Sequence, residues 1–300
     1  MLMGLLAGLV ALDLGLRDRG PQARTIGRLA AEFYRDKASR ALLVRGQERL
    51  ELRRGVDGAW VLPEHDDYLA SARTLDELLT ALTSLTTLDL VSLDASTHGE
   101  YGLGQQALNI EIWDETGQRV LGLMQGAEVS GGGASYVRLM GQDAVYRAAR
   151  LRTIRLDPRF WLDVQWLTFP AALVSRIELG GSALSGARTL LRDADTVDTW
   201  RVEGGERVGA SSIKNHLRAL RSLFVERVQG RADAEAPVLA PLLSVELELI
   251  DGRHFSVSIL AAAPGTQGVI GRRGSDDPFI VGFGESSWQA LLTSARQLLE

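Results

Sequence analysis

The strongest constraint on the fold of this chain is a twelve-residue segment that occurs twice. Residues 74–85 read TLDELLTALTSL and residues 212–223 read SIKNHLRALRSL, with five identical positions and no gap. In the first copy the leucines recur every three or four residues, which is the spacing of an amphipathic helix. Thr74 and Glu77 in that copy fit a capping box, in which each side chain accepts a hydrogen bond from a free backbone N–H at the helix start. A repeat of this kind predicts two related structural units.

Short alternating runs of apolar and polar residues precede each helix and predict antiparallel strands joined by hairpins. The first half has such runs at 49–53 and, with a tryptophan, at 59–62; the second half has them at 188–192 and, again with a tryptophan, at 199–202. Each meander is expected to end on its tryptophan strand and then to enter the helix. Further strand patterns follow each helix, at 108–113, 119–124, 136–140 and 144–147 in the first half and at 244–250, 254–260, 269–272 and 279–283 in the second.

These patterns predict an α+β fold of two tandem repeated units, each an antiparallel meander sheet with one or two packed helices. We expect an apolar anchor or helix with a linker at residues 1–36, a first unit at 37–168 and a second unit at 169–300. Trp60 and Trp200 occupy equivalent strand ends, so both are expected to anchor the core. Leucine-rich helices also resemble one another by chance, but strand, tryptophan and helix follow in the same order twice, which favours duplication.

Composition excludes several classes of protein. Hydrophobic residues make up 45% of the chain and charged residues 24%, which suits a packed core and excludes a disordered or fibrous protein. The formal net charge of −5 predicts no nucleic-acid partner, because a general nucleic-acid binder carries a basic surface. The chain has no cysteine, which removes disulfides, thiolate metal sites and cysteine nucleophiles.

The N-terminal residues bear on the cellular location. Residues 1–16 carry a single charged side chain, Asp13, and Arg17 and Arg19 follow. A membrane-spanning helix needs about 20 apolar residues, and a secretory signal begins with a basic region that is missing here. Three interpretations stay open: a short membrane anchor that begins upstream, which we favour, a buried or amphipathic first helix of a soluble protein, and a cleaved signal.

A set of short segments between residues 40 and 225 carries a family resemblance. The segments are the strand at 58–62 (GAWVL), the helix at 75–85, the motifs at 101–103 (YGL) and 107–113, the strands at 136–138 and 145–146, and the Trp200 strand with the helix at 213–223. Together they resemble the bacterial family of domain of unknown function 4340. The resemblance implies an N-terminal membrane anchor, a body outside the cytoplasm and genes near ABC-transporter components of the gliding-motility type. It implies no activity, so no functional residue is carried over.

Motifs for catalysis, cofactors and metals give no assembled site. Residues 102–107 (GLGQQA) superficially resemble a dinucleotide loop, but they precede a predicted strand instead of opening a helix, so they are interpreted as turn glycines. Residues 65–67 (HDD) are the densest group of potential metal ligands and are interpreted as a solvated loop. His216 takes the place of Leu78 in the repeat and is expected at a helix–sheet boundary with its polar tip in water. We therefore predict no catalytic residue, no cofactor and no metal.

One aromatic group stands apart from the predicted core. Phe160, Trp161, Trp166 and Phe169 lie close together in sequence, near the predicted junction of the two units. Aromatic side chains at such a place are typical of a groove or partner surface, so these four are the candidate binding residues. For Trp161 and Trp166, as for Trp113 and Trp288, the other interpretation is packing in the core or on the sheets, and it is favoured over a carbohydrate platform.

The sequence favours a non-enzymatic, membrane-anchored accessory protein on the extracytoplasmic (periplasmic) side of the membrane. It would act through protein partners, and ABC-transporter subunits enter as partners through the family resemblance alone. Two alternatives stay open. One is a soluble cytoplasmic scaffold whose first helix packs on the first unit. The other is an enzyme that acts on envelope glycans or lipids at a groove between the units.

Overall fold

The computed structural model describes residues 33–149, 151, 154–193, 199–232, 240–261, 268–274 and 277–300. The chain divides into two compact units. The first comprises Met1–Trp60 and Ala72–Phe160, and the second comprises Val61–Ser71 and Trp161–Glu300. The unit boundaries expected from the sequence alone stay a prediction.

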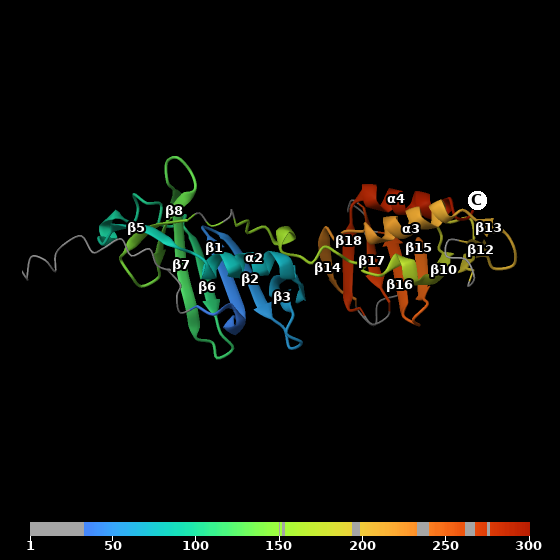
Figure 1. Ribbon diagram of the computed structural model, residues 1–300, viewed down its shortest axis with the longest axis horizontal. Helices are drawn as coiled ribbons and strands as arrows, with labels where there is room; N and C mark the ends of the chain where they lie inside the picture. Colours follow the sequence, from blue (N-terminus) through green and yellow to red (C-terminus); the bar gives the residue numbers. More distant parts are fainter. Residues whose placement is uncertain are drawn as a thin grey trace, which may run out of the picture. The chain divides into compact units, whose positions relative to one another are not determined.

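The described residues include two sets of nine strands (Figure 1). The first set is β1 (Arg40–Arg45), β2 (Glu48–Arg54), β3 (Trp60–Leu62), β4 (Tyr68–Leu69), β5 (Thr87–Ser92), β6 (Leu108–Trp113), β7 (Arg119–Glu128), β8 (Ala134–Leu139) and β9 (Val145–Ala149). The second set is β10 (Val174–Gly180), β11 (Arg188–Arg192), β12 (Trp200–Val202), β13 (Arg207–Val208), β14 (Arg227–Arg231), β15 (Leu243–Leu249), β16 (His254–Ala261), β17 (Val269–Arg273) and β18 (Phe279–Phe283).

Helices are fewer. The α-helices are α2 (Ala72–Thr83), α3 (Ala210–Arg221) and α4 (Glu285–Arg296), and the short 3-10 turns are η1 (Arg35–Lys37), η2 (Pro63–His65), η3 (Ala95–Thr97), η4 (Pro158–Phe160) and η5 (Ala171–Leu173). None of the helices in the described ranges has the length and apolar character that a bilayer crossing requires. The apolar residues 1–16 lie outside those ranges.

The two sheets have the same strand order. The first runs β4-β3-β2-β1-β6-β7-β8-β9-β5 and the second β13-β12-β11-β10-β15-β16-β17-β18-β14, so each strand of the first has its counterpart nine strands later. Neighbouring strands pair antiparallel, and alternate residues of central strands such as β6 and β15 are buried, as expected for strands with one face on the core. The predicted α+β fold of two similar units is confirmed.

Two details of each sheet differ from the sequence prediction. A two-residue edge strand, β4 or β13, lies between the tryptophan strand and the helix, and it is too short to show an alternating pattern. The strand after the helix, β5 or β14, pairs at the far edge with β9 or β18. Each sheet is therefore two meanders joined at β1–β6 or β10–β15, not one simple meander.

The helices pack by the leucine faces that the sequence indicates. In α2 the buried residues are Leu75, Leu78, Leu79 and Leu82, and in α3 they are Ile213, His216, Leu217 and Leu220. In the second unit α4 lies beside α3 on the same face of the sheet (Figure 1). In the first half, the described residues that follow β9 form only the turn η4.

The repeat also holds residue by residue before the first central strand. Ser39 Oγ donates a hydrogen bond to the carbonyl oxygen of Trp113 at 3.3 Å, and Ser175 Oγ donates one to the carbonyl oxygen of Glu248 at 3.0 Å. Ser39 is therefore equivalent to Ser175. By the same count the turn η1 is equivalent to η5, which makes Arg35 the counterpart of Ala171.

Candidate functional site

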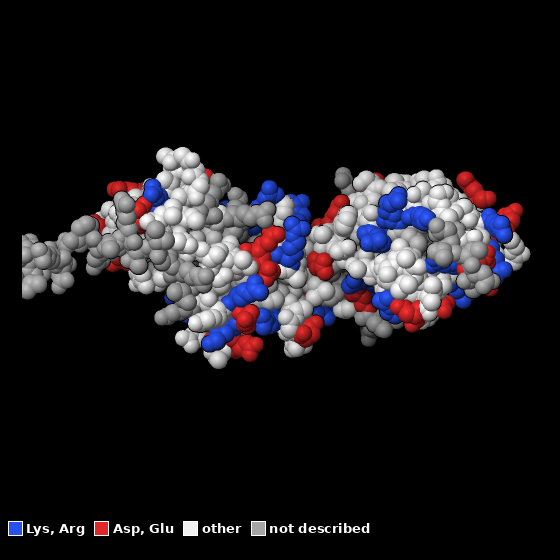
Figure 2. Space-filling model, in the orientation of Figure 1, with Lys and Arg blue, Asp and Glu red and all other residues white. Residues whose placement is uncertain are grey.

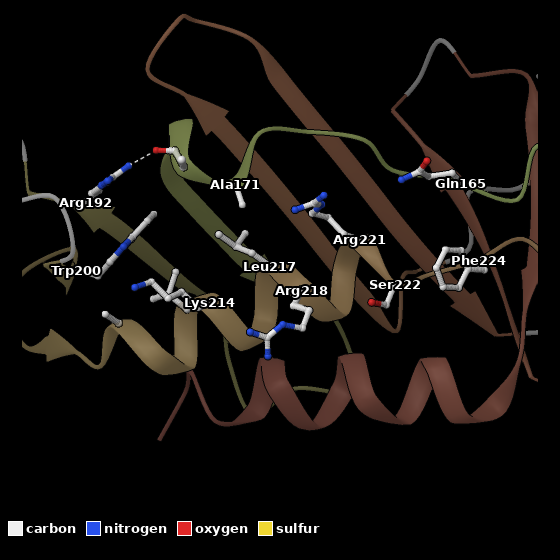
Figure 3. A pocket seen from close by; sticks show the side chains of 13 residues that line it. Gln165, Ala171, Arg192, Trp200, Lys214, Leu217, Arg218, Arg221, Ser222 and Phe224 are labelled. Atoms are coloured by element: carbon white, nitrogen blue, oxygen red, sulfur yellow. Dashed lines mark hydrogen bonds between the residues drawn. The ribbon is translucent and has the colours of Figure 1, made fainter.

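The second unit contains a pocket of about 670 Å³ that lies along α3 (Figure 3). We call it the α3 groove. One side of it is formed by α3 itself, and the other side by η5 and the strands β11 and β12. Gln165 and Phe224 lie at one end of the groove and Trp200 at the other (Figure 3).

Cationic side chains define the electrostatics of the α3 groove. Lys214, Arg218 and Arg221 come from α3, and Arg192 comes from the end of β11. The three α3 residues are spaced four and three apart, which places them on one face of the helix. Figure 2 shows blue side chains gathered over α3. The described residues that line the groove include four cationic side chains and no aspartate or glutamate.

The floor of the α3 groove is apolar. Ile213 and Leu217 are 1% and 4% exposed, and Trp200, at 5%, closes one end. Phe224 at the other end is 50% exposed, so an aromatic ring is available at the surface there. A positive wall above an apolar floor suits a ligand that carries both negative charge and apolar groups.

Hydrogen bonds hold two of the guanidinium groups. Arg192 Nη1 donates to the carbonyl oxygen of Ala172 in η5 at 2.5 Å, shown by the dashed line in Figure 3. Arg218 Nη1 donates to Oδ1 of Asn215, one turn earlier on α3, at 3.1 Å. Arg192 therefore links β11 to η5, two of the elements that form one side of the groove.

The equivalent place in the first unit is filled by an ion pair. There Arg35 of η1 donates to Oδ1 of Asp76 on α2 at 2.9 Å and to the hydroxyl of Thr80 at 3.3 Å. In the ungapped repeat Asp76 corresponds to Lys214 and Thr80 to Arg218. The second unit thus has alanine in place of the arginine and a cation in place of the acid. These exchanges distinguish the α3 groove from the equivalent place in the first unit.

The inner face of α3 carries a buried histidine. His216 Nδ1 lies 3.0 Å from Oγ of Ser294 on α4, and that hydroxyl donates to the carbonyl oxygen of Leu291 at 2.7 Å. Nδ1 therefore carries the proton and donates to Ser294. Nε2 is buried with no hydrogen-bond partner among the described residues. Burial lowers the pKa of His216 to about 4, because the charged form would lose its hydration.

The expectation that the tip of His216 is in water is wrong. The side chain is fully buried, because α4 covers this part of α3. The packing of α4 on α3 brings together residues that are far apart in sequence. The apolar periodicity of α3 alone does not indicate that another helix covers it.

The four aromatic residues predicted as a binding surface lie elsewhere. Phe160 is 46% exposed, with the guanidinium carbon of Arg155 4.2 Å from its ring centre. Trp161, Trp166 and Phe169 are buried. The ring of Trp166 packs 4.6 Å from that of Phe283, and the ring of Phe169 packs 5.8 Å from that of Phe255. None of the four lines the α3 groove, and their role in partner binding stays a prediction.

The other sequence candidates fall in turns. Residues 65–67 end η2 and continue into a turn, with Asp66 and Asp67 at φ of 57° and 62°. No group of three or more His, Asp or Glu side chains that could hold a metal ion occurs in the described ranges. Gly102 adopts a φ of +67° in the turn before β6, where a Cβ would lie 2.8 Å from the backbone nitrogen of Ala127. The interpretation of residues 102–107 as turn glycines fits this geometry.

Sequence reasoning did not single out the α3 groove, although its signal was present. Comparing the two copies of the repeat position by position places Lys214, Arg218 and Arg221 opposite Asp76, Thr80 and Thr83. Identical positions reveal the shared framework, whereas the exchanged positions reveal where one copy has changed its surface.

Comparison with known protein families finds a match. The family described as "Domain of unknown function (DUF4340)" matches residues 60–241, which is more than half of the chain. No curated protein and no solved structure matches the chain significantly.

Proposed function

We propose that this chain, which belongs to the DUF4340 family, is a binding protein and not an enzyme, and that it holds its partner in the α3 groove. The observation that carries the proposal is a pocket with four cationic side chains and an apolar floor. Guanidinium and ammonium groups keep their charge at neutral pH and donate hydrogen bonds without accepting them. Such a lining attracts anions and orients them, and it does not take protons from a substrate.

The equivalence of the two units supports the same conclusion. Both units use the same strand order and the same leucine positions for packing, so packing explains those residues in full. The three cations of α3 stand where the first unit has Asp76, Thr80 and Thr83, whereas Arg192 is the counterpart of Arg54. A surface that has diverged from its own copy while the core stayed the same is explained by recognition of another molecule.

The proposed location is the extracytoplasmic side of a membrane, where the protein serves an ABC transporter or another envelope complex as an accessory subunit. Two observations support this proposal: the apolar character of residues 1–16 and the membership of a family that the sequence resemblance associates with anchored proteins. Fractionation of cells that express the natural gene tests it. The protein is expected in carbonate-washed membranes and accessible to protease in spheroplasts. Recovery of the uncleaved chain in the soluble fraction contradicts the proposal.

Site-specific photocrosslinking tests partner binding at the groove. A photoreactive phenylalanine analogue replaces Phe224 at the groove end, and in a control protein it replaces Leu93, which is exposed at 66% in the first unit. We expect an adduct with another protein in living cells from position 224 and none from position 93. The adduct should disappear when Lys214→Asp is added. An adduct that is the same with and without this substitution, or no adduct at all, contradicts a partner site in the α3 groove.

A further inference from the structure

We infer that the α3 groove takes an extended segment of a partner protein in which acidic and apolar residues alternate. The inference rests on the proposed function and specifies its ligand. It follows from a comparison of the two units, from the spacing of the cations on α3 and from the depth of the apolar floor.

The first unit shows which chemistry fits this place in the fold. Its equivalent position holds one carboxylate, that of Asp76, against one guanidinium, that of Arg35, at 2.9 Å. In the second unit the cation stands on the helix, as Lys214, and the turn η5 presents the methyl group of Ala171. The helix of the second unit therefore presents positive charge where the helix of the first presents a carboxylate, which suits a ligand that carries carboxylates.

The spacing of the cations suits several carboxylates along an extended chain. Along the axis of α3, Lys214 and Arg218 are about 6 Å apart and Arg218 and Arg221 about 4.5 Å apart. Alternate residues of an extended peptide are about 6.6 Å apart and point to the same side. Acidic residues two positions apart therefore meet successive cations of α3. A single phosphate reaches fewer of them at once.

The side of the groove opposite α3 determines which peptide residues fit between the acidic ones. Side chains between the acidic ones point away from α3. On that side lie Ala171 and Ala172 of η5 together with the indole of Trp200. These groups are small or aromatic, so burying an apolar side chain against them costs less desolvation free energy than burying a polar one.

The depth of the floor favours a peptide over a membrane surface. Ile213 and Leu217 line the groove although they are almost fully buried. A narrow segment can enter the groove between α3 and η5. The flat surface of a bilayer contacts the rim and leaves the floor empty. We therefore commit to a protein segment.

Fluorescence anisotropy with the purified full chain tests the inference. The probe is a labelled peptide that alternates leucine and glutamate over about six residues, the length that spans the three α3 cations in extended form. The control is a peptide of the same composition with its leucines and glutamates in two blocks. We expect the alternating peptide to bind more tightly, with an affinity that falls as salt rises because the attraction is between charges.

Two variants connect binding to the α3 groove. Lys214→Asp should weaken binding of the alternating peptide by about tenfold or more, because attraction becomes repulsion at the first of the three α3 cations. Ala171→Arg with Lys214→Asp rebuilds the Arg35–Asp76 pair of the first unit, so it should fold and yet fail to bind. Arg207→Asp makes the same change of charge at an exposed residue of β13 outside the lining and should bind as the natural chain does. Thermal melts confirm that each variant is folded.

The outcomes separate this inference from the proposed function. Equal binding of the two peptides, or equal binding by the natural chain and the Lys214→Asp variant, overturns the alternating-segment inference. So does Lys214-dependent binding of phosphatidylglycerol vesicles or inorganic phosphate without binding of the peptide, since the site is then one for phosphate or lipid headgroups. If position 224 still gives a Lys214-dependent adduct with a protein in cells, the proposed function stands and only the ligand chemistry is wrong.

Discussion

His216 illustrates how one buried side chain links the pH of the medium to stability. Its imidazole lies between α3 and α4 with one hydrogen bond, to Ser294, and an unpartnered Nε2. Protonation would place an N–H and a charge in an apolar environment, so the folded protein resists it and the pKa falls to about 4. The unfolded chain takes up the proton near pH 6.5. Between these two values the unfolded state binds more protons than the folded state, and stability decreases as the pH decreases.

The first prediction concerns this titration. Lowering the pH from 7 to 4 should cost up to about 3 kcal/mol of stability through His216. His216→Leu places the residue of the first unit, Leu78, at this position and should remove that part of the pH dependence. Urea denaturation of both proteins at several pH values, followed by tryptophan fluorescence, gives the difference. Parallel pH profiles for the two proteins contradict the assignment.

At the residue scale, the sequence predicts which face of a helix a residue occupies better than it predicts whether the side chain reaches water. The helical period correctly places His216 on the same helix face as Ile213 and Leu217, because that face depends only on local spacing. Whether its ring reaches water depends on α4, which is more than sixty residues further along the chain. The buried state of Trp166 and Phe169 likewise depends on Phe283 and Phe255, which belong to distant strands.

At the scale of a single helix, adjacent residues of α3 have different roles, one in the core and one in the candidate site. Leu220 is fully buried and packs toward the sheet, whereas its neighbour Arg221 is exposed and lines the α3 groove. One helix thereby contributes a leucine face to the core and a cationic face to the candidate site. Stability and binding should therefore respond to different substitutions.

The second prediction compares these two neighbours. Leu220→Ala should lower the free energy of unfolding by about 2–5 kcal/mol, because it leaves a cavity in the core. Arg221→Ala should change it by no more than about 0.5 kcal/mol, as expected for an exposed side chain, and should weaken binding of the alternating peptide. Urea denaturation and anisotropy measure the two effects. A large loss of stability in Arg221→Ala, or unchanged binding, contradicts the division of tasks.

Elements with a regular period were predictable, and elements defined by distant pairing were not. The leucine spacing gave α2 and α3, and alternation gave most of the long strands. The edge strand β4 is two residues long, and the position of β5 at the far edge depends on pairing with β9. The α3 groove needs η5 and β11 beside the helix, so its residues come together only in the folded chain.

At the scale of the whole molecule, the two copies share a strand order and one equivalent helix, and α4 occurs among the described residues of the second copy only. Four positions account for the difference along the shared helix: Arg35, Asp76, Thr80 and Thr83 in the first unit stand where the second has alanine and three cations. The helix positions beneath them are buried in both copies. The binding property should therefore be transferable without disturbing the core.

The third prediction is such a transfer. The combined substitutions Arg35→Ala, Asp76→Lys, Thr80→Arg and Thr83→Arg should give the first unit a groove of the second type. The variant is expected to bind two alternating peptides per chain instead of one. Loss of the exposed Arg35–Asp76 pair should cost less than about 1 kcal/mol. Isothermal titration calorimetry gives the stoichiometry, and Lys214→Asp in the same background should return it to one. A stoichiometry that stays at one contradicts the role assigned to these four positions.

The likeness of the two sheets has a consequence for how the chain reaches its native state. A strand of one copy can join the sheet of the other by mistake, which is a characteristic hazard of tandem repeats. Each sheet ends on one side in a strand of only two residues, β4 or β13, and on the other in β5 or β14, whose pairing is interrupted by register shifts. Edge strands this short or irregular present few aligned N–H and C=O groups to an incoming strand. Lengthening β4 or β13 should therefore favour wrong strand pairing between the two copies and the formation of fibrils.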